Sequence, residues 1–220
     1  DATLIDPALL ARLQHADPGV RRIALMALAD EQDEDGLPWL AAALDDADAT
    51  VRAEAAQRLA GWDREIAVQA LLRALRDTDA AVSYNPVASA WKGNAVADAL
   101  TFAAHGIRFG IGTDATRGDG FRLMDAAETA QRLAFGARVG DSSTGGGWTW
   151  LDHATAAGAD AAGLRGLTGA VAPGLAADYL LVDLDVPETA PSWDLEWELV
   201  RLTGRDQILA VVVAGRPRLW

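Results

Sequence analysis

The segment RALRDTDAAVSYNPVASAW, residues 73–91, decides the fold because its pattern changes in the middle. Up to Val82 it follows a helical pattern that occurs twice earlier in the chain. After Val82 that pattern stops, because Pro86 removes a backbone donor and ends any helix that comes before it. We therefore expect two domains of different kinds, one over residues 1–82 and one over residues 83–220.

A repeat of 31 residues runs through the first domain. Three stretches align without gaps, and they are LLARLQHADPGVRRIALMALA from Leu9, LAAALDDADATVRAEAAQRLA from Leu40 and LLRALRDTDAAV from Leu71. Each stretch has leucines at helical spacing, an aspartate in a short turn and then a valine that opens a second helix. The turn aspartates, Asp17, Asp48 and Asp79, can accept hydrogen bonds from the free N–H groups of that helix. The period predicts a solenoid of helix pairs.

Residues 6–82 resemble the HEAT-like repeat family, in particular its short-period bacterial members, and DPGVRRIALMAL carries the resemblance. The resemblance implies a curved stack of helix pairs whose exposed faces bind protein partners or dock onto a neighbouring enzyme. It also implies that Arg21 and Arg52 brace neighbouring repeats through aspartate side chains. Trp39 and Trp62 are expected to pack at helix ends. The chain holds two and a half repeats, whereas about three are needed for stability.

The composition limits the kinds of partner. A net charge of -13 leaves no basic stripe for nucleic-acid phosphates, and it argues equally against an anionic membrane. No apolar run approaches the roughly 18 residues that a membrane-spanning helix needs. The chain has no cysteine, which leaves histidine, aspartate and glutamate as possible metal ligands. We expect a soluble, cytoplasmic protein that binds neither nucleic acid nor membrane.

Helical and β-type stretches alternate in the second domain, where most of the 21 glycines lie. The pattern predicts helices over residues 96–105, 122–135, 151–157 and 193–202. It predicts strands over residues 107–112, 179–183 and 208–214. A glycine-rich loop, STGGGWTW, precedes the third of these helices. The second domain is therefore expected to be an α/β structure.

The stretch GIRFGIGTDATRGDGFRLMDAAE, which begins at Gly106, contains the most suggestive chemistry. It reads as a buried strand that ends at Thr113 and Asp114, followed by a polar loop and a helix. Enzymes with parallel barrels hold their reactive groups at the carboxyl ends of the strands, where the loops converge. A carboxylate in such a place can bind a metal or move a proton, although the same pattern also occurs as a simple helix cap.

Five stretches resemble, in the same order, the C-terminal third of the amidohydrolases, metal-dependent (β/α)8-barrel hydrolases that include deaminases. They are SYNPVAS from Ser83, GIRFGIGTD from Gly106, TWLDHATAAGADAAGL from Thr149, TGAVAPGLAADYLLVDLD from Thr168 and VVVAGRP from Val211. The first resembles the segment after the seventh barrel strand, and the second resembles the eighth strand. The last two are similar to the family's return into a small β-sandwich. The resemblance implies a mainly α, HEAT-like solenoid followed by an α/β segment that corresponds to the last part of the barrel and its sandwich.

The resemblance also implies roles for individual residues. Asp114 would be the metal-proximal aspartate that deprotonates the attacking water and passes the proton to the leaving amine. Arg117 and Asp119, on the loop after the eighth strand, would touch the substrate. A divalent metal, zinc or iron, is implied by the resemblance alone.

The chain departs from this family at the metal ligands. The family holds its metal with an HxH pair and further histidines, but this sequence has no HxH and only three histidines, His15, His105 and His153. We expect all three to be ordinary helix or turn residues. A lone carboxylate binds a metal weakly, and without a Lewis acid the attacking water keeps a pKa of about 16. We therefore expect no hydrolysis by this chain alone.

The second domain is too short for a closed barrel, which usually takes about 250 residues. Its strands are expected to leave open edges and apolar faces that the repeat helices, a second copy, a separate polypeptide or residues outside this sequence would cover. A junction inside both patterns suggests a fusion, an internal deletion or a composite of two proteins. Two functions stay open: an amidohydrolase acting on a C–N bond of a small cyclic or guanidine-like substrate with ligands supplied from elsewhere, and a non-catalytic interaction scaffold with an α/β cap.

Overall fold

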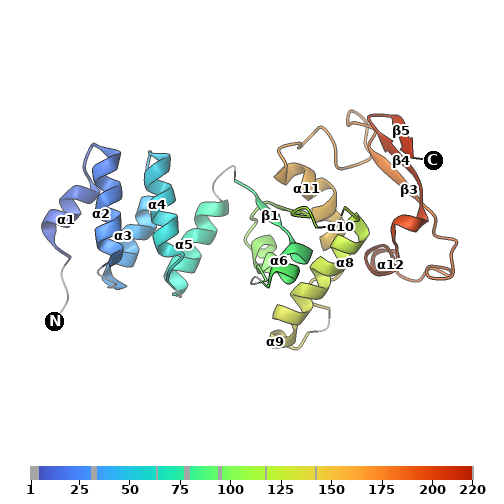
Figure 1. Ribbon diagram of the computed structural model, residues 1–220, viewed down its shortest axis with the longest axis horizontal. Coiled ribbons are helices and arrows are strands. Elements are labelled where there is room, and N and C mark those ends of the chain that lie inside the picture. Colours follow the sequence, from blue (N-terminus) through green and yellow to red (C-terminus); the bar gives the residue numbers. More distant parts are fainter. Residues whose placement is uncertain are drawn as a thin grey trace. The chain divides into compact units, whose positions relative to one another are not determined.

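The chain divides into two compact units, Asp1–Asp79 and Ala80–Trp220, whose elements Figure 1 shows in sequence order. The computed structural model describes residues 5–30, 34–62, 64–76, 80–93, 96–116, 118–141 and 143–219. The division falls three residues before the boundary placed at Val82, because Val82 pairs with a strand of the second unit. Over these described ranges, no helix combines the length and the hydropathy that crossing a membrane requires.

The first unit consists of helices that pack in pairs. They are α1 (Pro7–Leu13), α2 (Pro18–Asp30), α3 (Leu37–Ala42), α4 (Ala49–Leu59) and α5 (Glu65–Arg76), with short 3-10 turns at Glu34–Gly36 and Ala43–Asp45. Helix α1 packs on α2, α3 packs on α4, and the second helices α2 and α4 pack on each other. The repeated leucines and small residues form one continuous core, which includes Leu9, Leu25, Leu40, Val51, Leu59, Ala67 and Ala70. This is the arrangement that the 31-residue period predicts.

The turn aspartates cap the helices that follow them. Asp48 Oδ1 accepts a hydrogen bond from the backbone N–H of Thr50 at 2.8 Å, and Asp17 Oδ1 accepts one from Gly19 at 2.7 Å. These bonds satisfy N–H groups that have no partner within the helix. The third aspartate of the series, Asp79, lies outside the described residues.

Arg21 joins two neighbouring repeats. Its Nε and Nη2 donate to the two carboxylate oxygens of Asp46 at 2.8 and 2.7 Å, and its Nη1 donates to the backbone carbonyl of His15. The hydrogen bond from Arg21 lowers the pKa of the Asp46 carboxyl. The predicted bracing role is confirmed for Arg21. Arg52 makes the same local bonds as Arg21, since its Nη1 donates to the backbone carbonyls of Asp46 and Ala47. The aspartate one repeat further on, Asp77, lies outside the described residues, so the bracing role of Arg52 stays a prediction. Both tryptophans of this unit, Trp39 and Trp62, are partly buried against the core, as predicted.

The third repeat keeps its first helix and lacks its second. Where the pattern calls for a helix, the chain forms β1 (Val82–Tyr84), which pairs in parallel with β2 (Phe109–Ile111). Val82, whose position lies in the first turn of the second helix in a complete repeat, is here the first residue of a strand. Each of these two strands has one partner strand within the described residues, so each has an edge without a strand beside it.

The second unit surrounds this strand pair with helices and ends in a separate small sheet. Its helices are α6 (Pro86–Lys92), α7 (Ala99–Ala104), α8 (Gly120–Gln131), α9 (Ala137–Val139), α10 (Thr149–Ala154), α11 (Ala156–Ala161) and α12 (Leu195–Arg201), with a π turn at Arg132–Gly136 and a 3-10 turn at Arg205–Gln207. The small sheet is antiparallel, in the order β3 (Tyr179–Val182), β4 (Ile208–Val213), β5 (Arg216–Leu219). The core of this unit contains the buried aromatic rings of Tyr84, Phe109, Phe121 and Trp150.

Several predicted elements have different ends in the structure. The helix expected over residues 151–157 is two helices, because Thr155 leaves helical backbone at φ -125° and ψ -100° and separates α10 from α11. Strand β2 is three residues long, and α7 begins only after Asp98, which caps it through the N–H of Thr101. Helix α6 was not expected, although Pro86 at its first turn is well placed where an N–H has no partner.

A buried glutamine connects the elements around β1. Gln131 has no exposed surface, and its Nε2 donates to the hydroxyl of Tyr84 and to the carbonyl of Ala97, each at 2.8 Å. Its Oε1 accepts from the backbone N–H of Ala99 at 3.0 Å. Three polar groups of this side chain are thus satisfied inside the core, as burial demands. The network fixes α7 and β1 against the end of α8.

Two glycines allow β2 and α11 to approach closely. A Cβ added at Gly110 would lie 3.2 Å from Cα of Gly158, and one added at Gly158 would lie 2.5 Å from the carbonyl oxygen of His153. Both contacts are to backbone, which cannot rotate away. On the preceding helix, α10, the ring of His153 stacks on Phe109, with the ring centroids 3.5 Å apart.

We expect Arg21→Ala to destabilise the repeats, because it leaves the partly buried Asp46 carboxylate without its partner. Charged hydrogen bonds are stronger than neutral ones, and this pair is bidentate. Hydrogen exchange measured by mass spectrometry on the full chain should become faster in α1, α2 and α4 and stay unchanged in α8. Arg22→Ala is the matched control, since Arg22 is half exposed and its Nε lies 3.9 Å from Glu54. Equal effects of the two substitutions would contradict the bracing role.

The effect of Arg21→Ala should also depend on pH. Because the pKa of Asp46 is lowered in the folded chain, its contribution to stability is present above the unfolded value of 3.8 and is lost as the pH falls through the folded value. Urea denaturation at pH 7 and at a pH below 3.8 should therefore show a smaller difference between wild type and variant in acid. An undiminished difference in acid would mean that Arg21 acts without the Asp46 carboxylate.

We expect Gly158→Ala to destabilise the second unit by roughly 1–3 kcal/mol, the usual cost of forcing extra atoms into a packed site. The methyl group would press on the carbonyl of His153 and separate α11 from α10. Gly120→Ala is the control, because a Cβ at Gly120 meets nothing within 4 Å at the start of α8. Thermal melting followed by circular dichroism should show a lower Tm for the first variant alone.

Candidate functional site

Asp114 lies just beyond the carboxyl end of β2, in a tight turn. The ladder between the strands continues one step past Ile111, where the N–H of Gly112 donates to the carbonyl of Tyr84 at 2.8 Å. Asp114 and Ala115 then adopt left-handed backbone, with φ of 43° and 61°. Such values are uncommon for residues with a side chain. The turn points the chain away from the sheet immediately after the strand, as the sequence indicates.

The partner of Asp114 is an ammonium group. Lys92, the last residue of α6, forms an ion pair with the Asp114 carboxylate, and both side chains are a little less than half exposed. The helix that follows β1 and the turn that follows β2 are thereby joined at the same edge of the strand pair. Solvent screens a pair of this exposure, so it contributes little to stability. The pair matters for reactivity instead, because a cation already lies beside the carboxylate that was expected to bind a metal.

Other polar side chains at this edge bond to one another. Ser83 Oγ donates to Asn85 Oδ1 at 3.1 Å, and Asn85 Nδ2 donates back to the carbonyl of Ser83 at 3.2 Å. Both side chains lie against Gly112, where a Cβ would come within 2.5 Å of them. These residues therefore brace the strand end next to Asp114.

Of the two residues expected to touch substrate, the structure describes Asp119 alone. Asp119 is the N-cap of α8, where its Oδ1 accepts a hydrogen bond from the N–H of Arg122 at 3.3 Å. This is a structural role. Arg117 lies outside the described residues.

Each of the three histidines has a local structural role. His15 Nδ1 accepts a hydrogen bond from the N–H of Asp17 at 3.0 Å, and His105 is the C-cap of α7. His153 Nδ1 lies 2.9 Å from the carbonyl oxygen of Phe109, on whose ring the imidazole stacks. The expectation that these are ordinary turn and helix residues is confirmed.

The described residues around Asp114 do not fit a divalent metal. Among those residues, no group of three or more histidine, aspartate or glutamate side chains is placed to hold an ion. Zinc and iron sites in proteins take three or four such ligands. Asp114 offers one carboxylate whose neighbour is the ammonium of Lys92, which repels a second cation.

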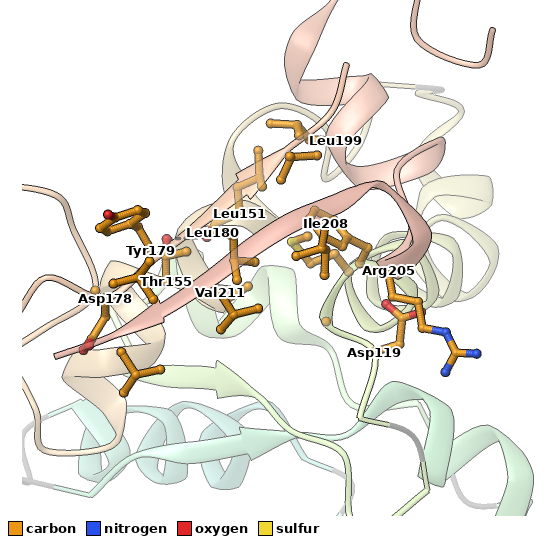
Figure 2. Close-up of a pocket in the computed structure, with 18 of the residues that line it drawn as sticks. Asp119, Leu151, Thr155, Asp178, Tyr179, Leu180, Leu199, Arg205, Ile208 and Val211 are labelled. Carbon is orange, nitrogen blue, oxygen red and sulfur yellow. Dashed lines mark hydrogen bonds between the residues drawn. The ribbon is translucent and has the colours of Figure 1, made fainter. Parts of the chain in front are cut away.

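A separate cleft of about 1530 Å3 opens between the small sheet and the helices of the second unit. Figure 2 shows Asp119 and Arg205 at one end of it and Asp178 at the other, with apolar side chains such as Leu151 and Ile208 between them. Neither Asp114 nor Lys92 lines the cleft. Small-molecule sites are usually about 300–1,000 Å3, so this space is larger than a typical ligand pocket.

The polar groups of the cleft are largely engaged in structure. Asp178 accepts hydrogen bonds from Thr168 Oγ1 at 2.6 Å and from the N–H of Ala214 at 2.7 Å, and the first of these lowers the pKa of its carboxyl most. Asp178 thus ties the loop before β3 to the turn after β4. Most of the other side chains that line the cleft, such as Leu151, Leu180 and Ile208, are apolar.

The ion pair with Lys92 was missed by the sequence analysis. Lys92 stands 22 residues before Asp114, a separation without meaning in either helical or strand periodicity. A prediction of the parallel pairing of β1 with β2 could have indicated the ion pair, because the elements that follow two parallel strands meet at one edge of the sheet. Reading α6 as a helix after Pro86 would have brought its last residue to that edge.

The two parts of the chain match different families of known proteins. Residues 7–88 match the family model described as HEAT repeats, a match that extends past the first unit into β1 and the start of α6.

The C-terminal part matches curated deaminases. The chain is 30% identical over 135 residues to a 5-methylthioadenosine/S-adenosylhomocysteine deaminase of Desulforudis audaxviator, covering 61% of this chain and 31% of that protein. It is 32% identical over 135 residues to the corresponding deaminase of Nitratidesulfovibrio vulgaris, covering 61% of this chain and 30% of that protein. The chain thus spans about a third of the length of the curated relatives that it matches.

Solved structures give the same result. A zinc-bound adenosine deaminase from Xanthomonas campestris matches with a TM-score of 0.63 and 26% identity, over 69% of this chain and 34% of that chain. The guanine deaminase of E. coli shares the fold, with a TM-score of 0.59 and 18% identity over 92% of this chain and 52% of that chain. The protein therefore carries HEAT repeats in its N-terminal part and homology to deaminases of the amidohydrolase type in its C-terminal part.

Proposed function

We propose that the C-terminal unit is part of a metal-dependent amidohydrolase of deaminase type, and that this chain does not hydrolyse C–N bonds by itself. In the reaction of such an enzyme, water adds to the carbon that bears the amino group, the C–N bond breaks, and a carbonyl and ammonia are released. The unit would correspond to the last two strands of the barrel and to the small sheet that follows it. Strands β1 and β2 support this, since they are parallel and Asp114 follows the second.

The names of the relatives suggest the substrate class. They act on 5-methylthioadenosine, S-adenosylhomocysteine and adenosine, which all carry an amino group on a purine ring. An amine-bearing heterocycle is therefore the substrate that we propose for the enzyme to which this unit is related. Substrate choice depends on loops around the reacting carbon, and the relatives are about three times longer than the region that matches.

The proposal rests on the groups that lie around Asp114. Its carboxylate is paired with Lys92, the imidazoles of His15 and His153 are engaged in local contacts, and His105 is the C-cap of α7. A carboxylate alone leaves water with a pKa of about 16, too high for attack at neutral pH. Asp114 can accept a proton or hold a water molecule, but it cannot by itself generate the nucleophile. Metal ligands from elsewhere would be needed.

The HEAT repeats suggest how the chain would meet other proteins. Helix α5 has no second helix of its own repeat to pack on, and Ile66 and Val68 on it are more than 40% exposed. We propose that the repeats bind a protein partner in the cytoplasm. An interaction role and the hydrolase ancestry of the second unit are compatible with each other.

The test is turnover by the purified full chain. With 5-methylthioadenosine or adenosine and added zinc or iron, we expect ammonia release at the background rate. We expect wild type, Asp114→Asn and Asp206→Asn to be indistinguishable, where Asp206 is the matched control because its carboxylate is 99% exposed.

Turnover that a chelator abolishes would refute the proposed inactivity. If Asp114→Asn also abolished that turnover while Asp206→Asn did not, Asp114 would be a catalytic residue of this chain on its own.

A further inference from the structure

An exposed aromatic surface lies where α12 begins. We define the tryptophan surface as Trp148, Trp193, Leu195 and Trp197, whose side chains are 56%, 88%, 41% and 48% exposed. Three of the four fall within five residues of one another, at the start of α12. Trp148 immediately precedes α10, which packs on α12. Exposed tryptophans in such numbers are uncommon on a surface that meets only water.

Sequence and structure connect Trp148 to the other three. A Cβ added at Gly147 would lie 3.3 Å from Glu196 Oε2, so the glycine-rich loop runs beside the first turn of α12. The backbone of Gly147 has a φ of 74°, which a residue with a side chain rarely adopts. The predicted loop STGGGWTW therefore has a definite position here.

The backbone that carries Trp193 and Trp197 is held by hydrogen bonds to the carboxylates of Glu198 and Asp194. Glu198 is 4% exposed, and its carboxylate accepts hydrogen bonds from Ser192 Oγ at 2.6 Å and from the N–H groups of Trp193 and Asp194 at 2.8 and 3.2 Å. Asp194 Oδ1 caps the helix by accepting from the N–H of Trp197 at 3.1 Å. The rings thus project from an ordered segment, and ordering before binding lowers the entropic cost of association.

The charges next to this surface are negative. Asp194 and Glu196 alternate with the apolar side chains, and the segment PSWDLEWE that begins at Pro191 contains no basic residue. The nearby guanidinium groups are engaged. Arg201 pairs with Asp125 and Glu128, and Arg132 pairs with Glu128. The helix N–H groups at Trp193, Asp194 and Trp197 are likewise satisfied by carboxylates.

Charge selects among the molecules that could cover this surface. A second copy of the chain would bring another net charge of -13 and would place carboxylates against carboxylates. An anionic membrane would be repelled for the same reason. A basic polypeptide would find both a complementary charge and aromatic faces. Lysine and arginine side chains bind over the face of tryptophan more favourably than over any other ring.

We propose that the tryptophan surface is the docking site for a lysine- and arginine-rich segment of a partner protein. The indole faces of Trp193 and Trp197 take the cationic side chains, and Glu196 and Asp194 supply the opposing charge. Tryptophan at the centre of such an interface is typically a residue whose removal costs most of the affinity. This docking site lies on the second unit and is separate from the repeats and from Asp114.

The experiment measures binding of two labelled peptides to the full chain by fluorescence anisotropy. One peptide alternates arginine with leucine, and the other has glutamate at each arginine position. We expect the basic peptide alone to bind, with an affinity that falls as salt is raised. The double variant Trp193→Ala/Trp197→Ala should weaken binding by about tenfold or more. Glu196→Gln should weaken it by a few fold, about the strength of one exposed charge interaction.

Trp91→Ala is the matched control, because Trp91 is 78% exposed on α6 beside Lys92 and has no acidic neighbour in sequence. Its binding should equal that of wild type. Circular dichroism verifies that the exposed substitutions leave the fold intact. Equal binding of the acidic peptide, or unchanged binding by the double variant, would overturn the proposal. Sedimentation with phosphatidylserine vesicles that depends on Trp193 and Trp197 would overturn it in favour of a membrane.

Discussion

The parallel pairing of β1 with β2 is the constraint on which the second unit depends. It takes Val82 out of the repeat and opposite Phe109, so the solenoid ends after the first helix of its third repeat. The same pairing brings the segments that follow the two strands to one edge. Lys92 and Asp114 meet there, although α7, β2 and the intervening loops separate them in the chain. The pairing of these two short strands therefore determines both where the repeat helices end and which group the Asp114 carboxylate contacts.

In this chain the Asp114 carboxylate lies against the ammonium group of Lys92, and the solved deaminase that it matches in fold has zinc bound. In the second unit the imidazole of His153, on α10, is used for packing, because it stacks on the ring of Phe109 and its Nδ1 lies beside the carbonyl of that residue. A shared fold positions an aspartate after a strand. It does not supply the other ligands that a metal needs, which come from separate elements. Fold and reactivity are therefore separable properties of this unit.

The repeats could be predicted from the sequence because their signals are local. An aspartate two residues before a helical N–H group, and leucines at helical spacing, act within a few residues, as Asp48 and Thr50 demonstrate. The pair of Lys92 with Asp114 and the buried network of Gln131 could not be predicted in this way. Each joins residues that only the tertiary arrangement brings together, 22 and 47 positions apart. Strand β1 could not be predicted because it is three residues long, too short for an alternating pattern. The break at Thr155 could not be predicted because threonine is not a residue type that regularly ends a helix.

Asp114 paired with an ammonium group, with no imidazole beside it, is the central claim of this account. Crystals of the full chain grown with excess zinc, measured at the zinc absorption edge, test it most directly. The account predicts no anomalous peak within bonding distance of the Asp114 carboxylate and electron density for Lys92 Nζ against it. A zinc peak about 2.0–2.2 Å from that carboxylate, with histidine nitrogens completing its coordination, would contradict the account.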